Sequence, residues 1–499
     1  MEHKGYEYEV VVIGGGIIGA FTFNNLVLSG VKAVLVEAGE DVSVGATKAN
    51  SAIIHAGYDC KSGTNKAKFN VRGNQMYEKI AERLGEKIKK TGSLVVSGKD
   101  GLSELERLYN QGIQNGVVGL KILEREELLK LEPNLSKNVS YGLYAPSAMI
   151  VSPYNFAISL CEEAMINGGK LLLNFEVDKI VNKGDFFEVY SKEKMVTGRF
   201  VINCAGAGCA KINSLVGAEK LDIHLTKGEY LILDKSEKGL VNRPIFPLPT
   251  KAGKGILVLP TVSNNILCGP TARDINEFDT SVTPEGIAEI KQKTGIMVDN
   301  LNFKKVIKLY AGVRVKCGDD FIVGFSKIVP NFYITAGIAS PGLASAPAIA
   351  EKIMQDLTLM GVKTKKFTPK RRTPYTDTRA LTKTELNNLI KKNSKYGRLV
   401  CRCEGITEGE IEEVLKGPIS PLTIEGIKRR LRPTMGRCQG SFCLPSLIEI
   451  LSKAYKTAPE NIVVANKTPL ILNSIKEGGI YENWCCNNWW RFCRNECCS

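Results

Sequence analysis

The chain has 499 residues, more than the roughly 250–300 at which one hydrophobic core stops growing, so the sequence predicts at least two cores. Hydrophobic residues make up 43% and charged residues 24%, and no stretch approaches the ~18 uninterrupted apolar residues of a membrane span, which excludes the disordered and membrane-spanning classes. The net charge of +15 favours anionic partners, but the basic clusters Lys87–Lys90 and Lys428–Arg432 are short and lack interleaved aromatic residues. We interpret both clusters as solvated surface and expect no nucleic-acid binding.

The N-terminal residues and the cysteine count bear on the compartment. Met1–Glu9 is polar, and the apolar run Val10–Ile13 is far too short for a signal peptide, so we expect a cytoplasmic protein. In that compartment the fifteen cysteines, an odd number, should be thiols or metal ligands rather than disulfides.

The first segment is typical of a βαβ unit, with strand patterns at Glu9–Ile13 and Ala33–Val36 and a helix pattern at Ile17–Ser29. Two further strand-like runs, Phe200–Cys204 and Phe332–Thr335, also precede glycines. We expect the first strand and these two runs to end at one edge of a parallel sheet.

The remaining chain predicts further units. Alternation and turn residues in Tyr230–Leu233 and Gly255–Gly269 indicate a separate antiparallel sheet, so the two domains should be interleaved in sequence. Gly361–Pro374 has two prolines and almost no apolar residues, which indicates a linker. A compact module with four cysteines and two helical patterns follows at about Tyr396–Tyr455.

The last stretch, Glu482–Ser499, differs in composition from the rest of the chain. It contains all three tryptophans and five of the fifteen cysteines. It is either a frameshifted or read-through end without selected function or a cysteine-rich metal-binding tail. The cysteines lack a recognisable paired ligand spacing, which favours the first hypothesis.

A G-x-G-x-x-G motif lies between the first predicted strand and helix. Gly14 permits the tight turn, Gly16 lets the backbone approach a pyrophosphate, and Gly19 allows close packing of the helix. The helix N-terminus, which begins with Ile17 and Ile18, then faces the anion. The motif therefore predicts dinucleotide binding, the alternative being a glycine-rich turn without ligand.

Glu37 ends the second strand, where a carboxylate can accept hydrogen bonds from both ribose hydroxyls. The motif alone does not separate NAD from FAD, but later segments do. Over about Tyr8–Leu357 the chain resembles the FAD-dependent oxidoreductases of the D-amino-acid oxidase and glycerol-3-phosphate dehydrogenase superfamily. The matching segments are Gly45–Asp59 (GATKANSAIIHAGYD), Lys227–Lys235 (KGEYLILDK), Lys254–Thr261 (KGILVLPT), Tyr310–Lys316 (YAGVRVK) and Ile334–Ile353 (ITAGIASPGLASAPAIAEKI).

The resemblance implies FAD and the residues that line it. Thr47 and Ser51 would lie along the flavin, and Val177 would lie near the adenine. Ala205 and Gly206 would close over the cofactor. Gly337, Gly342 and Leu343 would bring a helix N-terminus to the pyrimidine end of the flavin, where the helix dipole stabilises the negative charge of the reduced flavin.

Three residues resemble substrate-handling groups of the superfamily. His55 matches the histidine of an N-S-x-x-x-H motif that takes the hydroxyl proton in alcohol-oxidising members; the alternative is a core histidine fixed by a backbone hydrogen bond. Arg314 resembles the arginine that binds a substrate carboxylate or phosphate, the alternative being a surface salt bridge. Lys254 is a weaker second candidate for the anion.

The four cysteines of the C-terminal module are Cys401 and Cys403, then Cys438 and Cys443 within RPTMGRCQGSFC. This pattern resembles the bacterioferritin-associated-ferredoxin-like (BFD-like) domain, which implies a [2Fe-2S] cluster on four thiolates. Structural zinc and free buried thiols are the alternatives, but the Cys-x-Cys spacing is unlike the Cys-x-x-Cys knuckles usual for zinc.

We therefore predict an α/β and α+β chain with interleaved domains. Within 1–360, a Rossmann-like FAD-binding domain (about 6–85, 145–215 and 305–360) alternates with an antiparallel-sheet substrate domain (about 86–144 and 216–304). A linker (361–395), a small helical [2Fe-2S] module (396–455) and a C-terminal extension (456–499) follow.

The domain order resembles anaerobic-type glycerol-3-phosphate dehydrogenases, catalytic subunit. This implies oxidation of sn-glycerol 3-phosphate to dihydroxyacetone phosphate, with electrons leaving through the iron-sulfur centre to a second redox flavoprotein or a quinone-linked subunit. Such a subunit would hold the chain at the membrane periphery. A dehydrogenase of L-2-hydroxyglutarate-like acids or of imino or amino acids is one alternative, and a non-catalytic electron-transfer or assembly subunit is another.

Overall fold

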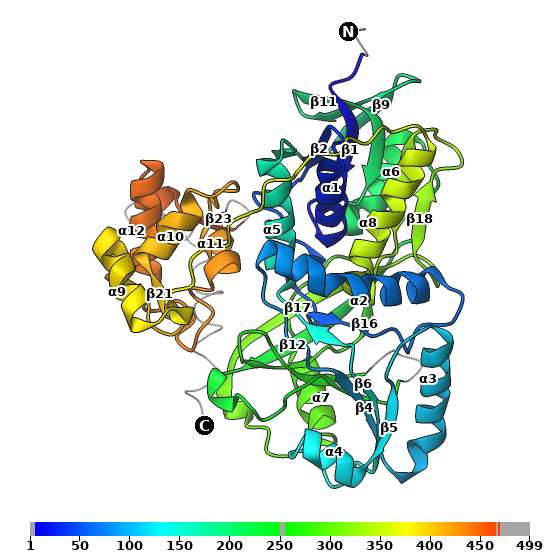
Figure 1. Cartoon of the computed structure of the whole chain (residues 1–499), viewed down its shortest axis with the longest axis vertical. Helices are drawn as coiled ribbons and strands as arrows, with labels where there is room; N and C mark the ends of the chain where they lie inside the picture. The colour runs from blue at the N-terminus through cyan, green and yellow to red at the C-terminus, as the bar shows by residue number, and fades with distance from the viewer. Residues whose placement is uncertain (1–4, 250–254, 466–467, 470–499) are drawn as a thin grey trace, which may run out of the picture.

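The computed structural model describes residues 5–249, 255–465 and 468–469, which form two large sheets and a C-terminal module (Figure 1). The first sheet has eight strands in the order β18-β19-β11-β1-β2-β8, with β10 antiparallel to β11 and β9 antiparallel to β10. Its strands are β1 (Tyr8–Ile13), β2 (Ala33–Val36), β8 (Lys170–Leu172), β9 (Lys179–Asn182), β10 (Phe187–Ser191), β11 (Lys194–Asn203), β18 (Ile322–Phe325) and β19 (Phe332–Ala336).

The three predicted parallel strands β1, β11 and β19 are confirmed as neighbours in this sheet. Ile13 pairs with Asn203, which pairs with Ile334, so their carboxyl ends meet at one edge. Helices bury one face, and α1 has ten of its twelve residues buried because it lies inside this layer. The covering helices are α1 (Ile17–Leu28), α2 (Asn65–Leu84), α5 (Pro153–Ile166) and α8 (Gly342–Leu359); α6 (Cys209–Val216) packs on the other face.

The second sheet has nine strands, in the order β16-β12-β15-β14-β13-β4-β6-β5 with β17 on β12, and lies below the first in Figure 1. The predicted antiparallel pairing of its central strands is confirmed. Its strands are β4 (Ser93–Ser97), β5 (Lys121–Glu124), β6 (Tyr141–Ala145), β12 (His224–Leu233), β13 (Ile245–Pro247), β14 (Leu257–Pro260), β15 (Ile266–Gly269), β16 (Arg273–Ile275) and β17 (Val306–Lys316). Helices α3 (Leu102–Gln114), α4 (Arg125–Leu131) and α7 (Pro284–Gly295) pack on it, and the two-stranded ladder of β3 (Ile53–Ile54) and β7 (Met149–Ile150) is separate.

Strand β17 differs from the sequence prediction, which placed 305–360 in the FAD-binding part. It pairs with β12 from His224↔Lys316 to Leu233↔Val306, so it belongs to the second sheet. The sheet to which a strand belongs depends on pairing with distant residues, which the local sequence pattern does not indicate.

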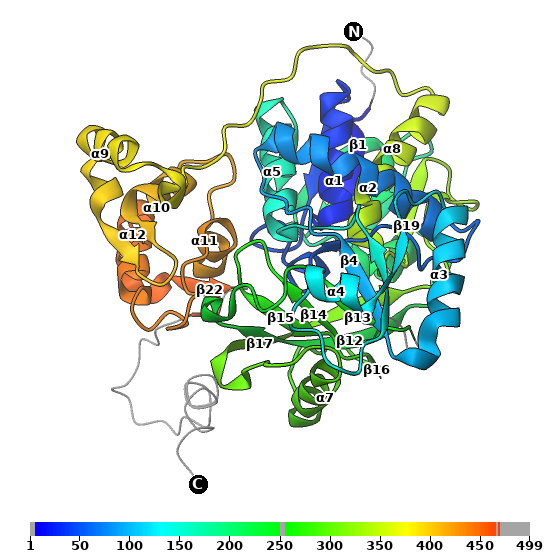
Figure 2. The ribbon, with the colours of Figure 1, turned by 60° about the horizontal axis from the view of Figure 1, so that its bottom comes forward.

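The module lies beside both sheets and is reached by a strap of residues 362–377 without regular secondary structure (Figure 2). The strap is fixed by the Lys365 amide, which donates to the Ser29 carbonyl (2.9 Å), and by Arg372, which pairs with Glu162 (2.5 Å). The module contains α10 (Glu408–Leu415), α11 (Ile424–Leu431), α12 (Leu444–Tyr455), β20 (Leu399–Cys401), β21 (Ile406–Thr407), β22 (Val463–Ala465) and β23 (Thr468–Pro469).

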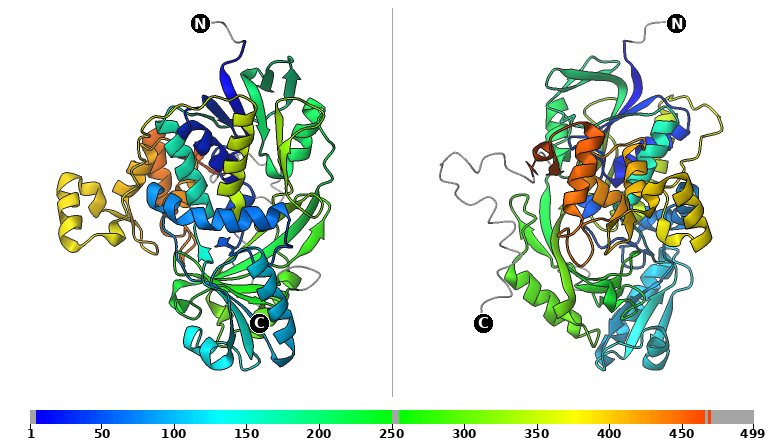
Figure 3. Two further views of the ribbon diagram at one scale, coloured as in Figure 1. Left: turned by 45° about the vertical axis from the view of Figure 1, so that its right-hand side comes forward. Right: turned by 90° about the vertical axis from the view of Figure 1, so that its left-hand side faces the viewer.

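The predicted linker 361–395 also contains a helix, α9 (Lys383–Lys392), at the outer side of the module (Figure 3, left). Thr382 and Glu385 form a capping box that begins it. None of the helices in the described ranges has the length and apolar character needed to cross a membrane.

Candidate active site and cysteine cluster

The loop between β1 and α1 requires glycine at two positions. Gly14 has a φ of 106°, and a Cβ there would lie 2.5 Å from the Cys204 carbonyl oxygen. A Cβ on Gly19 would lie 1.9 Å from the Gly14 carbonyl oxygen, so only glycine allows this close packing. Gly16 is half-buried, and the nearest atom to a Cβ there would be Thr47 Oγ1 at 3.4 Å, which leaves its backbone approachable.

Two helix N-termini meet the carboxyl edge of the first sheet without an acidic residue in their first turns, those of α1 and α8. The Ile17 amide of α1 donates to Thr47 Oγ1 at 2.9 Å. The positive end of each helix dipole therefore has no acidic side chain of its own helix beside it. Such an end suits a bound anion, either a phosphate or the reduced ring of a flavin dinucleotide.

Glu37, at the end of β2, accepts the amides of Gly15 (2.5 Å) and Gly39 (2.7 Å). Burial raises the pKa of Glu37 and outweighs the lowering effect of these two amides. The carboxylate is thereby fixed beside the glycine loop, with further lone pairs for hydroxyl donors.

The other predicted cofactor residues lie around the same edge. Ala205 and Gly206 follow β11, and Gly337 follows β19. The strand ends are tied together, because the Cys204 amide donates to the Ile13 carbonyl (2.8 Å) and Thr335 Oγ1 donates to the Asn203 carbonyl (2.7 Å). Val177 is buried in the core against β2, and α8 starts at Gly342 and Leu343.

The segment that carries His55 runs from this edge to the second sheet. The His55 carbonyl accepts Asn70 Nδ2 (2.9 Å) and Asn74 Nδ2 (3.1 Å), which fixes the backbone. The half-buried imidazole lies 5.8 Å from the Phe246 ring of β13, between ring centroids. The His55 ring therefore lies next to the second sheet.

Tyr230 of β12, which the sequence did not single out, lies beside the predicted site residues Ser51 and Arg314. Its hydroxyl lies 3.4 Å from Ser51 Oγ, and its ring stacks on Tyr310 with centroids 4.7 Å apart. Burial raises the pKa of Tyr230, against the opposing effect of Arg314, so the hydroxyl stays protonated at neutral pH. Tyr230 lies in Lys227–Lys235, one of the segments that resemble the superfamily. Its cross-strand pairing with Tyr310 is the signal that could have identified it.

Arg314 lies on β17 next to this tyrosine pair. Its Nη2 donates to the Thr271 carbonyl at 2.6 Å, and its buried Nε has no hydrogen-bond partner. Gly228 on the neighbouring strand makes room, since a Cβ there would lie 3.0 Å from Nη2. The surface salt bridge considered as an alternative is absent among the described residues, and a guanidinium with a free buried donor suits an anion. The predicted Lys254 falls outside the described residues.

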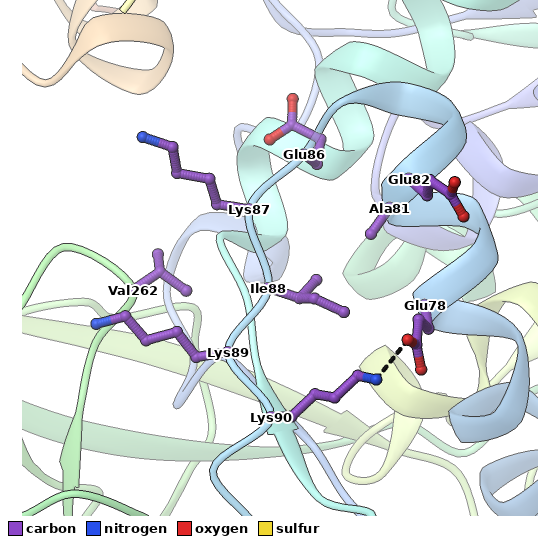
Figure 4. Close-up of a pocket in the computed structure, with 9 residues that line it drawn as sticks. All are labelled: Glu78, Ala81, Glu82, Glu86, Lys87, Ile88, Lys89, Lys90 and Val262. Atoms are coloured by element: carbon purple, nitrogen blue, oxygen red, sulfur yellow. Dashed lines mark hydrogen bonds and ion pairs between the residues drawn. The ribbon is translucent and has the colours of Figure 1, made fainter. Parts of the chain in front are cut away.

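A surface cavity of about 610 Å³ lies away from these groups (Figure 4). Its lysines already have partners: Lys90 pairs with Glu78, Lys87 with Asp377, and Lys89 donates to Asn264. It is lined by Glu78, Ala81, Glu82, Glu86, Lys87, Ile88, Lys89, Lys90 and Val262.

The four cysteines of the module come together in two pairs. The thiols of Cys401 and Cys443 are hydrogen-bond neighbours, and so are those of Cys403 and Cys438. Two thiolates for each of two irons is the ligand set of a [2Fe-2S] cluster.

Backbone amides also point at these sulfur atoms. The amides of Glu404 and Thr434 are hydrogen-bond donors to Cys401, and those of Gly440 and Phe442 to Cys438. Such donors stabilise thiolates and tune a cluster, so the residues present fit the group.

The module is held against the body by buried charges. Asp41, in the loop after β2, accepts Arg429 Nη2 (2.9 Å) and Arg430 Nη1 and Nη2 (2.7 and 3.1 Å). All three side chains are at most 2% exposed. The interpretation of 428–432 as solvated surface is therefore wrong for Arg429 and Arg430, because their counter-ion comes from a distant part of the chain.

Comparisons with known proteins agree with both parts of this geometry. Residues 9–355 match the FAD dependent oxidoreductase family, and residues 399–453 match the BFD-like [2Fe-2S] binding domain. The chain belongs to the FAD dependent oxidoreductase family, and it is a two-centre member of it: its cofactors are FAD and a [2Fe-2S] cluster.

Individual relatives within this family include glycerol 3-phosphate dehydrogenases and oxidases. The chain is 40% identical over 452 residues to a glycerol 3-phosphate dehydrogenase of Caloramator mitchellensis, covering 89% of this chain and 94% of the relative. It is 29% identical over 359 residues to a glycerol 3-phosphate oxidase of Mycoplasma pneumoniae, covering 70% and 94%. The solved structure of dithionite-reduced L-alpha-glycerophosphate oxidase from Mycoplasma pneumoniae with FAD bound matches with a TM-score of 0.69 at 28% identity, covering 74% of this chain and 99% of that chain.

Proposed function

We propose that this chain oxidises sn-glycerol 3-phosphate to dihydroxyacetone phosphate and passes the electrons to a protein acceptor, either a second redox flavoprotein or a quinone-linked subunit. The observation that carries the proposal is the buried Arg314 Nε without a hydrogen-bond partner, beside the tyrosine pair of the second sheet. The identity of 40% to a glycerol 3-phosphate dehydrogenase supports a phosphate as the anion that this donor takes.

Arg314 would bind the substrate phosphate. Its bond to the Thr271 carbonyl holds the guanidinium in one orientation and leaves Nε for a phosphate oxygen. Lys254 is proposed as a second contact to the same anion. Tyr230 and Ser51, 3.4 Å apart, would complete the wall between the anion and the cofactor.

His55 would accept the proton of the C2 hydroxyl while hydride leaves C2. The two asparagine bonds to its carbonyl fix the backbone, so the imidazole is positioned before substrate arrives. FAD supplies the two-electron acceptor for the hydride, and the [2Fe-2S] centre supplies a one-electron acceptor. Neutral imidazole suits the proton transfer near pH 7.

Anaerobic stopped-flow bleaching of the flavin tests the assignment with sn-glycerol 3-phosphate, L-2-hydroxyglutarate and L-proline as donors. We expect only glycerol 3-phosphate to bleach it, and His55→Ala to slow bleaching by ~10²–10⁴ with little change in affinity. His224→Ala is the matched control, because that side chain is 66% exposed and pairs with Asp222. Bleaching by another donor alone would replace the substrate, and bleaching by none would favour a non-catalytic subunit.

A further inference from the structure

The two cysteine pairs of the module differ in exposure. Cys401 and Cys443 are 1% and 0% exposed, whereas Cys403 is exposed and Cys438 half-exposed. Because each iron of a two-iron cluster takes two thiolates, one iron would face the interior of the module and the other would face solvent. The outer pair is therefore the side from which an electron can leave.

Contacts with the turn that follows β12 hold the cluster loops in place. Arg437, beside Cys438, pairs with Asp234 at 2.8 Å. Glu404, beside Cys403, is 1% exposed and pairs with Lys235 at 2.8 Å and Arg432 at 3.0 Å. The bonds to Asp234 and Lys235 hold the cluster loops against the body, and the bond to Arg432 fixes Glu404 within the module.

The side chains around the exposed sulfur are cationic and aromatic. The Arg402 guanidinium lies 4.2 Å from the Phe442 ring centroid and has no acidic partner among the described residues. Phe442 is 47% exposed, and the Arg437 side chain is 70% exposed although it is paired. We call Arg402, Cys403, Arg437 and Phe442 the exit face.

We propose that the exit face is the docking surface for an acidic one-electron carrier protein whose redox centre is ringed by carboxylates. The proposal rests on the proposed function only for the source of the electrons. An exposed aromatic ring with a guanidinium stacked on it gives a small apolar contact with a cationic rim, the pattern of a transient interface. The cations attract carboxylates and repel a carrier ringed by lysines. In the step the cluster loses one electron and the carrier gains one, with no bond made or broken.

The test uses full-length holoenzyme whose cluster has been reduced with dithionite and freed of excess reductant, so the result does not depend on the substrate. It is mixed with acidic cytochrome b5 or with basic cytochrome c at low salt and at about 0.3 M salt, where charge interactions are screened. Calorimetry of the oxidised proteins measures binding separately, and the EPR signal of the cluster checks that each variant is loaded.

We expect faster reduction of cytochrome b5 than of cytochrome c at low salt, with the preference lost at high salt. Arg402→Glu should lower the rate with cytochrome b5 by about tenfold, and Arg402→Gln and Phe442→Ala should weaken binding several-fold. Lys453→Glu is the matched control, because Lys453 is 75% exposed near the far end of α12, roughly 15 Å along the helix from Cys443, and should stay within about twofold.

Three results would overturn the proposal. Cytochrome c could be reduced faster than cytochrome b5 at low salt. Lys453→Glu could lower the rate as much as Arg402→Glu, which would show that overall charge alone acts. Fully loaded Arg402 and Phe442 variants could also bind and react like the wild type.

Discussion

Replacing Asp41 by alanine should undock the iron-sulfur module from the flavin-binding part. The carboxylate accepts three guanidinium hydrogen bonds of 2.7–3.1 Å, and its removal leaves two arginines, each at most 2% exposed, without their counter-ion. Breaking such a buried pair costs ~3–5 kcal/mol, so the undocked fraction should rise by about two to four orders of magnitude. The Nε and Nη1 atoms of Arg429 and Nε of Arg430 already lack partners, and the other acceptors of Arg430, the Gly426 and Ile419 carbonyls, carry no charge.

Amide hydrogen exchange of α11, which carries both arginines, measures this opening, because its amides should exchange faster by the same factor. Glu449→Ala is the control, since that glutamate is 65% exposed and its pair with Lys453 should contribute under about 1 kcal/mol. The triple change Asp41→Leu, Arg429→Met and Arg430→Met should restore protection, because no buried charge is left. The reasoning is refuted if Asp41→Ala exchanges within about threefold of wild type, or if the triple variant opens as readily as the single one.

Further predictions concern the cofactors, the anion and pH. Cys438→Ser should lose the cluster and its EPR signal while FAD stays bound; an unchanged iron content would contradict the ligand assignment. Arg314→Leu should weaken binding of glycerol 3-phosphate by roughly ten- to a hundredfold in anaerobic titrations, and unchanged affinity would remove it from the site. Gly19→Ala should lower FAD content and the free energy of unfolding by ~1–3 kcal/mol, because the new Cβ would lie 1.9 Å from a carbonyl oxygen, whereas Gly295→Ala, with open space around it, should do neither. Burial opposes ionisation of Asp41, but Arg430 and Arg429 lower its pKa overall, so docking should be complete at neutral pH and be lost only as pH falls below about 4, as α11 exchange against pH would show.

The sequence was sufficient where the signal is local. The strand, glycine loop and helix at Tyr8–Leu28 follow from adjacent residues, and the four module cysteines from their spacing. Helix α9, which the sequence prediction placed in the linker, also has a local signal, because Thr382 and Glu385 form the capping box at its N-terminus.

The sequence failed where partners are distant. Arg430 looks like surface charge until Asp41, 389 positions earlier, is placed against it. Strand β17 was assigned to the flavin-binding part because only its register with β12, Arg314 opposite Thr226, reveals its sheet. The roles of His55 and Arg314 stay predictions, although the structure places Arg314 beside the tyrosine pair and His55 in the segment that starts at Ser51.

One measurement tests the central claim most directly. The holoenzyme is titrated anaerobically with sn-glycerol 3-phosphate, and flavin absorbance and the EPR signal of the cluster are recorded on the same samples. The account predicts that the flavin bleaches and that the EPR signal of a reduced [2Fe-2S] centre then appears, whereas Cys438→Ser bleaches without the signal. Two results would contradict the account. The flavin could stay oxidised. It could also bleach while the wild-type cluster takes no electron, although dithionite reduces that cluster in the same sample.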